Sequence, residues 1–131
     1  MPYLNNPIRM TETRSRVKRR MFRLSTSLTY VICPVCGELY DPDGMDLHEI
    51  VPRHQIVNKV TLNLLPVELH VLVCQKCHTP WLHGEEGRIK MFKYAIELWG
   101  QAQVRLAVRD FNKHLVTPLS SSIIPYELLG E

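Results

Sequence analysis

Apolar positions repeat with two different spacings along this chain, and each spacing predicts a different kind of element. Residues 85–115 place apolar side chains every three to four positions, which is the period of an amphipathic helix. The stripe consists of Ile89, Phe92, Ile96, Trp99, Ala102 and Leu106. Because Gly100 lies inside this stretch, we expect the helix to kink or divide there.

Shorter apolar runs predict strands nearer the middle of the chain. Residues 28–32 are β-branched and aromatic, which favours a short strand leading into Cys33. The segment 41–44 reads Asp-Pro-Asp-Gly, a turn sequence, and we expect a second strand near residues 45–51. Residues 67–73 are apolar enough to form a buried strand.

The N-terminal region predicts another helix. Residues 11–24 contain neither proline nor glycine and carry a narrow apolar stripe of helical period. We therefore expect a basic arm with a helix over residues 1–27, a small domain over 28–84 and a helical extension over 85–131. The combination of short strands and helices indicates an α+β fold.

Composition indicates a folded protein of about one domain. The chain has 131 residues, 45% of them hydrophobic and 22% charged. No apolar run approaches the roughly 20 residues that span a bilayer, so we expect no membrane partner. The first residues also lack the apolar core of a secretory signal. These features predict a cytoplasmic, intracellular protein, in which cysteines are more often metal ligands than disulfides.

Charge is distributed unevenly. Residues 1–23 carry seven basic side chains and one acidic side chain, whereas the remainder carries nine basic and twelve acidic ones. Such an arm is typical of proteins that bind a polyanion such as DNA, although a solvated helix face is an equally good interpretation. The basic residues are Arg9, Arg14, Arg16, Lys18, Arg19, Arg20 and Arg23.

All four cysteines lie in two Cys-x-x-Cys pairs. Each pair can turn two thiolates to one side of a tight turn, which supplies half of a tetrahedral zinc site. Two pairs predict a closed, structural zinc site; a thioredoxin-like redox site would need one pair in a βαβ context. The predicted ligands are Cys33, Cys36, Cys74 and Cys77.

Histidines gather around these two pairs in the sequence. His48, His54, His78 and His83 are close to them, with His70 nearby. Imidazoles with an open coordination position would form a catalytic type of metal site, although each histidine alone is typical of a surface or capping residue. Asp46 and His48 are two residues apart, so a strand would place both on one face.

The segments CPVCG (33–37), MDLHEIVPRH (45–54) and LVCQKCHTPWLH (72–83) resemble the HNH, or ββα-metal, nucleases, particularly phage-type members with two Cys-x-x-Cys knuckles. The resemblance covers about residues 31–83 and implies a zinc-stabilised, treble-clef-like ββα-metal domain. It implies that His48, His78 and His83 hold a catalytic cation such as Mg²⁺, Mn²⁺ or Zn²⁺. It also implies that Glu49 occupies the general-base position and that Arg53 lies near phosphate.

The sequence departs from the family pattern at three places. Glu49 stands where the family has a histidine base, and a change of register would instead make Asp46 the ligand and His48 the base. Leu69 occupies the position of the family asparagine, for which His70 or Asn63 are the available substitutes. His78 and His83 are five residues apart, about 140° around a regular α-helix.

The resemblance implies a metal-dependent DNA endonuclease that hydrolyses phosphodiester bonds, nicking with low sequence specificity. It would contact mainly the phosphate backbone. Two alternatives stay open: a zinc-stabilised DNA-binding module without catalysis, and an accessory protein of a larger phage DNA-processing complex in a bacterial host. In the last case, Trp99 and Phe111 would form a docking surface, although such aromatics are more often core.

Overall fold

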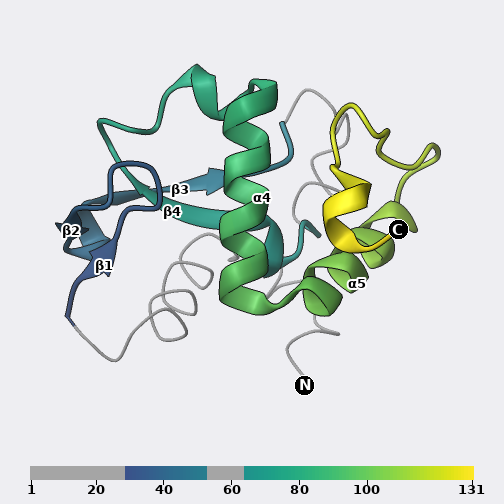
Figure 1. Cartoon of the computed structure of the whole chain (residues 1–131), viewed down its shortest axis with the longest axis horizontal. Coiled ribbons are helices and arrows are strands. Elements are labelled where there is room, and N and C mark those ends of the chain that lie inside the picture. Colours follow the sequence, from purple (N-terminus) through teal and green to yellow (C-terminus); the bar gives the residue numbers. More distant parts are fainter. Residues whose placement is uncertain (1–28, 53–63) are drawn as a thin grey trace.

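In the part of the chain that the structure describes, four short strands form two separate antiparallel pairs (Figure 1). In this computed structural model, residues 29–52 and 64–131 are described. Strand β1 (Val31–Ile32) pairs with β2 (Leu39–Tyr40), and β3 (Met45–Glu49) pairs with β4 (His70–Cys74). Together with two α-helices in the described part of the chain, these pairs confirm the expected α+β class.

The predicted turn before β3 is present and has a clear local cause. A 3₁₀ turn covers Pro42–Gly44, and the Asp41 carboxylate accepts a hydrogen bond from the Asp43 backbone N–H at 2.9 Å. This arrangement is the side-chain capping expected of Asp before a short helical turn. The turn delivers the chain into β3, whose first residue, Met45, lies opposite Cys74 of β4. The long strand pair therefore starts beside the second cysteine pair.

The prediction of a strand over residues 67–73 is wrong for residues 67–69. Val67–Leu69 form a 3₁₀ turn, in which the Leu69 N–H donates to the Pro66 carbonyl, and the strand begins only at His70. Apolar character alone does not separate these two states, because Leu69 is fully buried in the turn as it would be in a strand.

The predicted C-terminal helix is two helices. Helix α4 (Glu85–Trp99) and helix α5 (Gln101–Asn112) meet at Gly100, whose φ of 93° lies in a region that favours glycine. Figure 1 shows α4 crossing over the β3–β4 pair, with α5 at the far end from β1 and β2. The sequence therefore located the division correctly.

One core joins the strands to both helices. Phe92 of α4 and Phe111 of α5 are buried with the β4 residues Val71 and Val73. Phe111 is thus a core residue, as is usual for such aromatics, and Trp99 packs against the same cluster. The alternative docking surface therefore cannot include Phe111. Burial of large aromatics supplies apolar area that a small domain needs.

Several predicted features lie outside the described residues. These are the basic arm with its helix, and Arg53, His54 and Asn63. Within the described part of the chain, no helix has both the length and the apolar character needed to cross a membrane.

Candidate functional site

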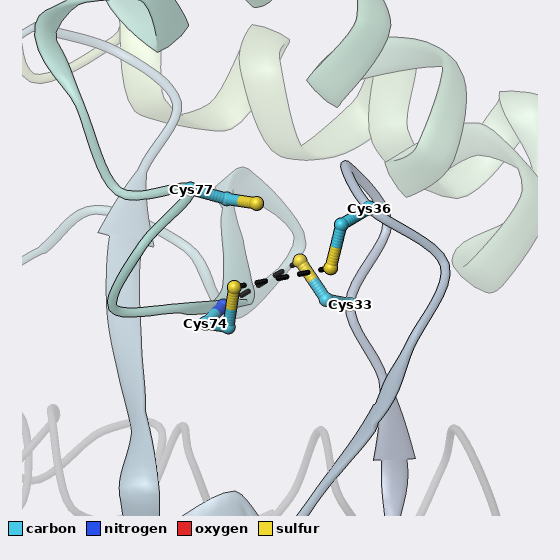
Figure 2. A group of neighbouring side chains, drawn as sticks. All are labelled: Cys33, Cys36, Cys74 and Cys77. Carbon is cyan, nitrogen blue, oxygen red and sulfur yellow. Dashed lines mark hydrogen bonds between the residues drawn. The ribbon is translucent and has the colours of Figure 1, made fainter.

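The four cysteine side chains converge from two loops. Cys33 and Cys36 follow β1, whereas Cys74 ends β4 and Cys77 lies in the turn after it; Figure 2 shows their sulfur atoms facing one another. All four sulfur atoms lie within 4.8 Å of one another, and all four cysteines are free thiols. Residues some forty positions apart in the sequence thus form one cluster that could hold a metal ion such as zinc.

Backbone hydrogen bonds shape each of the two knuckles. The Gly37 N–H donates to the Cys33 carbonyl at 2.8 Å, and Gly37 has a φ of 77°, where a side chain would be strained. In the second knuckle, the N–H groups of Cys77 and His78 both donate to the Cys74 carbonyl. These turns are what allow two thiols separated by two residues to point the same way.

The pKa values of two thiols in the cluster are shifted in opposite directions. Burial, together with hydrogen bonds to Cys74 and Cys36, raises the pKa of Cys77 to about 12. Burial also raises the pKa of Cys74, but hydrogen bonds from Tyr40 and Cys77 outweigh it and bring the pKa to about 6. The Tyr40 hydroxyl and the neighbouring thiols thus stabilise a thiolate at Cys74. Because a zinc ion would stabilise several thiolates at once, the donor set fits the predicted structural metal.

Three histidines meet beside this cluster. His48 comes from β3, His78 directly follows Cys77, and His83 ends the 3₁₀ helix η5 (Pro80–His83). The His48 ring centroid lies 5.4 Å from that of His78 and 4.7 Å from that of His83. The structure therefore brings together the three histidines that the resemblance names as cation ligands.

His48 is the most unusual member of this group. Its side chain is 1% exposed, and among the described residues neither of its ring nitrogens has a hydrogen-bond partner. Burial, together with the neighbouring His83 and His78, lowers the pKa of His48 to about 3. Since buried polar atoms in proteins are normally paired, two such nitrogens in one ring need an explanation.

The 3₁₀ geometry of η5 explains how His83 reaches His48. The sequence expectation used a regular α-helix, on which His78 and His83 would diverge. Instead, Thr79 precedes η5 in extended conformation, and the Leu82 N–H donates to the Thr79 carbonyl at 3.1 Å. Because the chain makes this tight turn between His78 and His83, the angle of about 140° that separates them on a regular α-helix does not apply.

Two residues of α4 support this turn, and the sequence predicts no functional role for either of them. The Arg88 guanidinium donates to the His83 carbonyl at 2.8 Å. Gly87 packs so closely on η5 that a Cβ there would lie 2.2 Å from the Trp81 carbonyl oxygen. A glycine inside a helical pattern is a signal for such close packing, but only the structure names the partner.

Asp46 contacts the ring of His78, and His70 contacts the backbone of Pro66. Asp46 and His48 lie on one face of β3, as their spacing on a strand predicts, and both contact His78: Asp46 Oδ2 lies 2.9 Å from His78 Nδ1. His70 is buried, and its Nδ1 lies 2.9 Å from the Pro66 carbonyl oxygen. His70 thus anchors the turn before β4.

Glu49 is the last residue of β3 and pairs across the sheet with His70. Its side chain is half-buried. Because side chains alternate along a strand, Glu49 lies on the opposite face of β3 from Asp46 and His48.

The cysteine cluster is tighter than the histidine cluster. In the described residues, the four thiols are the one set of three or more ligand side chains whose donor atoms all lie within 4.8 Å of one another. In the same residues, His48, His78 and His83 do not form such a group.

Comparison with models of known protein families, with curated proteins and with solved structures finds no match to this chain.

Proposed function

We propose that this chain is a metal-dependent DNA endonuclease of the HNH type, in which the four cysteines hold a structural zinc in a treble-clef-like ββα-metal domain. The observation that carries the proposal is His48, a buried imidazole whose two nitrogens lack partners among the described residues. It packs against His78 and His83, the other two residues that the motif resemblance selects.

The donor chemistry fits a divalent cation. Three imidazoles with a carboxylate nearby suit zinc, nickel or a related ion. A cation bound by His48 would satisfy a buried nitrogen that has no partner among the described residues. When bound, the cation would stabilise negative charge on the scissile phosphate and its leaving oxygen. His48, His78 and His83 would hold it.

The remaining residues would act on water and on the DNA backbone. In the reaction, water attacks phosphorus, the bond to the 3′ oxygen breaks, and the products are a 3′ hydroxyl and a 5′ phosphate. Glu49 would accept the proton from the attacking water, a task for which a carboxylate is a weaker base than an imidazole at neutral pH. Arg53 and the basic side chains of residues 14–23 would contact phosphates and position the protein without reading sequence.

One observation favours a second candidate function. Glu49 replaces the histidine base and lies on the opposite face of β3 from His48. A DNA-binding module that retains the frame without catalysis, alone or within a phage DNA-processing complex, would need no base at all.

Nicking of a supercoiled plasmid tests the proposal. The protein would be incubated with Mg²⁺, Mn²⁺, Ni²⁺ or EDTA, beside His48→Ala and His78→Ala variants. We expect cation-dependent nicking that falls more than about 100-fold in both variants, since loss of even an outer partner of a metal ligand costs 10- to 100-fold. His114→Ala is the matched control, because His114 is exposed and follows α5.

The other outcomes are distinct. A gel shift of the same plasmid without nicking under any cation would support the binding module and contradict the nuclease. If nicking occurs, Glu49→Gln decides the base: we expect a large loss in kcat with little change in DNA affinity, whereas unchanged nicking would exclude Glu49 from proton transfer.

A further inference from the structure

Asp46 makes a contact that the proposed reaction does not yet use. It is the second residue of β3, and its Oδ2 atom lies 2.9 Å from Nδ1 of His78, a residue 32 positions away in the sequence. The two side chains are 39% and 34% exposed. An ion pair this open to water contributes little to stability, so a stabilising role does not account for the contact.

The chemistry of the two groups determines where the proton lies. An ionised carboxylate can only accept hydrogen bonds, so Nδ1 of His78 must be the donor and carry the proton. In the neutral ring, the lone pair is then on Nε2. The same hydrogen bond also fixes the rotation of the ring, which meets the His48 ring at 77°.

We propose that Asp46 is a positioning residue that holds His78 as the Nδ1–H tautomer and so presents Nε2 to the cation. This inference rests on the proposed function, since it concerns the same site. Carboxylates paired in this way with metal-binding histidines orient the ring and make the ligand more basic. Asp46 therefore acts through His78, and its Oδ2 is occupied by that ring.

Asp46 could either orient His78 or bind the cation itself, and the two roles need different positions of its carboxylate. If Asp46 were itself a ligand, as a change in register of the motif would require, its carboxylate would turn away from His78 toward the cation. The hydrogen bond to His78 instead leaves His48 and His78 as ligands, with Asp46 behind them.

The first test reads the tautomer directly, in zinc-loaded protein without a second cation. Long-range ¹H–¹⁵N correlation spectra distinguish the two ring nitrogens of each histidine. We expect the Nδ1–H form of His78 in the wild type and in Asp46→Asn, because the asparagine amide oxygen also accepts a hydrogen bond. In Asp46→Ala we expect a shift toward the Nε2–H form. Asp43→Ala, which removes an exposed carboxylate from the turn before β3, should change nothing.

The second test measures Ni²⁺ binding to the same zinc-loaded variants by calorimetry. We expect Asp46→Ala to weaken Ni²⁺ binding 10- to 100-fold, the usual cost of losing such a partner, and Asp46→Asn to restore most of it. Equal affinity in Asp46→Ala and wild type would overturn the proposal, as would an unchanged His78 tautomer in Asp46→Ala.

Failure of the proposed function would look different. A wild-type protein that binds no Ni²⁺, but whose His78 tautomer still follows Asp46, would overturn the cation site while supporting the orientation of His78 by Asp46. The two failures are therefore distinguishable.

Discussion

Single side chains differ sharply in what they contribute to the two candidate metal sites. Cys33 and Cys74 are buried in the core, whereas Cys36 is exposed at the edge of the cysteine cluster. Cys36 nevertheless approaches Cys74, with 3.9 Å between the two sulfur atoms. Its side chain adds little to the core, so its place in the cluster is the one expected of a metal ligand.

Replacing Cys36 with Ser tests the zinc site with little disturbance of packing. We expect the variant to lose its zinc and to unfold, because structural zinc contributes about 10–16 kcal/mol in zinc-finger peptides, as much as the whole stability of a typical domain. Zinc content by elemental analysis and thermal unfolding by circular dichroism would measure both effects.

The matched control for this variant is Leu39→Ser, at an exposed position in the neighbouring strand β2. It should keep about one zinc per chain and melt close to the wild type. A Cys36→Ser protein that is folded and fully zinc-loaded would remove Cys36 from the ligand set. Treatment of the wild type with a strong chelator should reproduce the loss of structure.

At the scale of elements, the 3₁₀ turn η5 and the first turn of α4 act as one support for His83. Arg88 holds the His83 carbonyl from α4, and Gly87 allows α4 to approach η5 at backbone contact. A second N–H of the Arg88 guanidinium donates to the Ser122 carbonyl in the C-terminal segment. The position of His83 thus depends on η5, on α4 and on the C-terminal segment around Ser122.

Gly87→Ala should reveal this dependence. Alanine is intrinsically better than glycine in a helix by about 1 kcal/mol, but its Cβ would lie 2.2 Å from the Trp81 carbonyl oxygen and 2.7 Å from the Leu82 Cα. Since both atoms are backbone, α4 or η5 must move, and we expect a net loss of about 1–3 kcal/mol in the free energy of unfolding. Urea denaturation would measure it.

Gly44→Ala is the matched control for the helix variant. An added Cβ at Gly44 meets nothing within 4 Å, so the change in stability should stay within about 0.5 kcal/mol. If the two variants had the same free energy of unfolding, α4 would not approach η5 as closely as described.

On the scale of the whole molecule, the C-terminal region is part of the same packed unit as the strands. Its 3₁₀ helix η6 (Tyr126–Leu129) buries Leu129, and α5 holds the backbone there through side-chain hydrogen bonds. Gln101 donates to the Leu128 carbonyl at 2.9 Å, and Arg105 donates to the Leu129 carbonyl at 3.1 Å. The region therefore serves at least to complete the core.

The charge asymmetry leads to a prediction for the complete chain. Deletion of residues 1–23 removes seven basic side chains, so DNA binding should weaken and its dependence on salt should become shallower. Each lost phosphate contact changes the slope of log K against log salt by about 0.9. Fluorescence anisotropy with a short duplex between about 50 and 200 mM salt would measure the slope.

Deletion of residues 1–8 is the control, because this segment contains no basic side chain. It should leave the slope unchanged. An equal slope in the wild type and in the chain lacking residues 1–23 would mean that the arm does not contact DNA.

The features determined by sequence alone are those with a local cause. The two Cys-x-x-Cys pairs, the turn at 41–44 and the division of the C-terminal helix at Gly100 each depend on the chemistry of a few adjacent residues, and all are present. The shared face of Asp46 and His48 follows from strand alternation in the same way.

Tertiary structure decided everything that depends on residues distant in sequence. The start of β4 at His70, the approach of His83 to His48 and the contact of Asp46 with His78 have no local signature. Each is set by packing, because the free energy of a turn or side-chain orientation is small beside that of burying the apolar surface of a whole element. The sequence could therefore name the candidate ligands, and only the fold could bring them together.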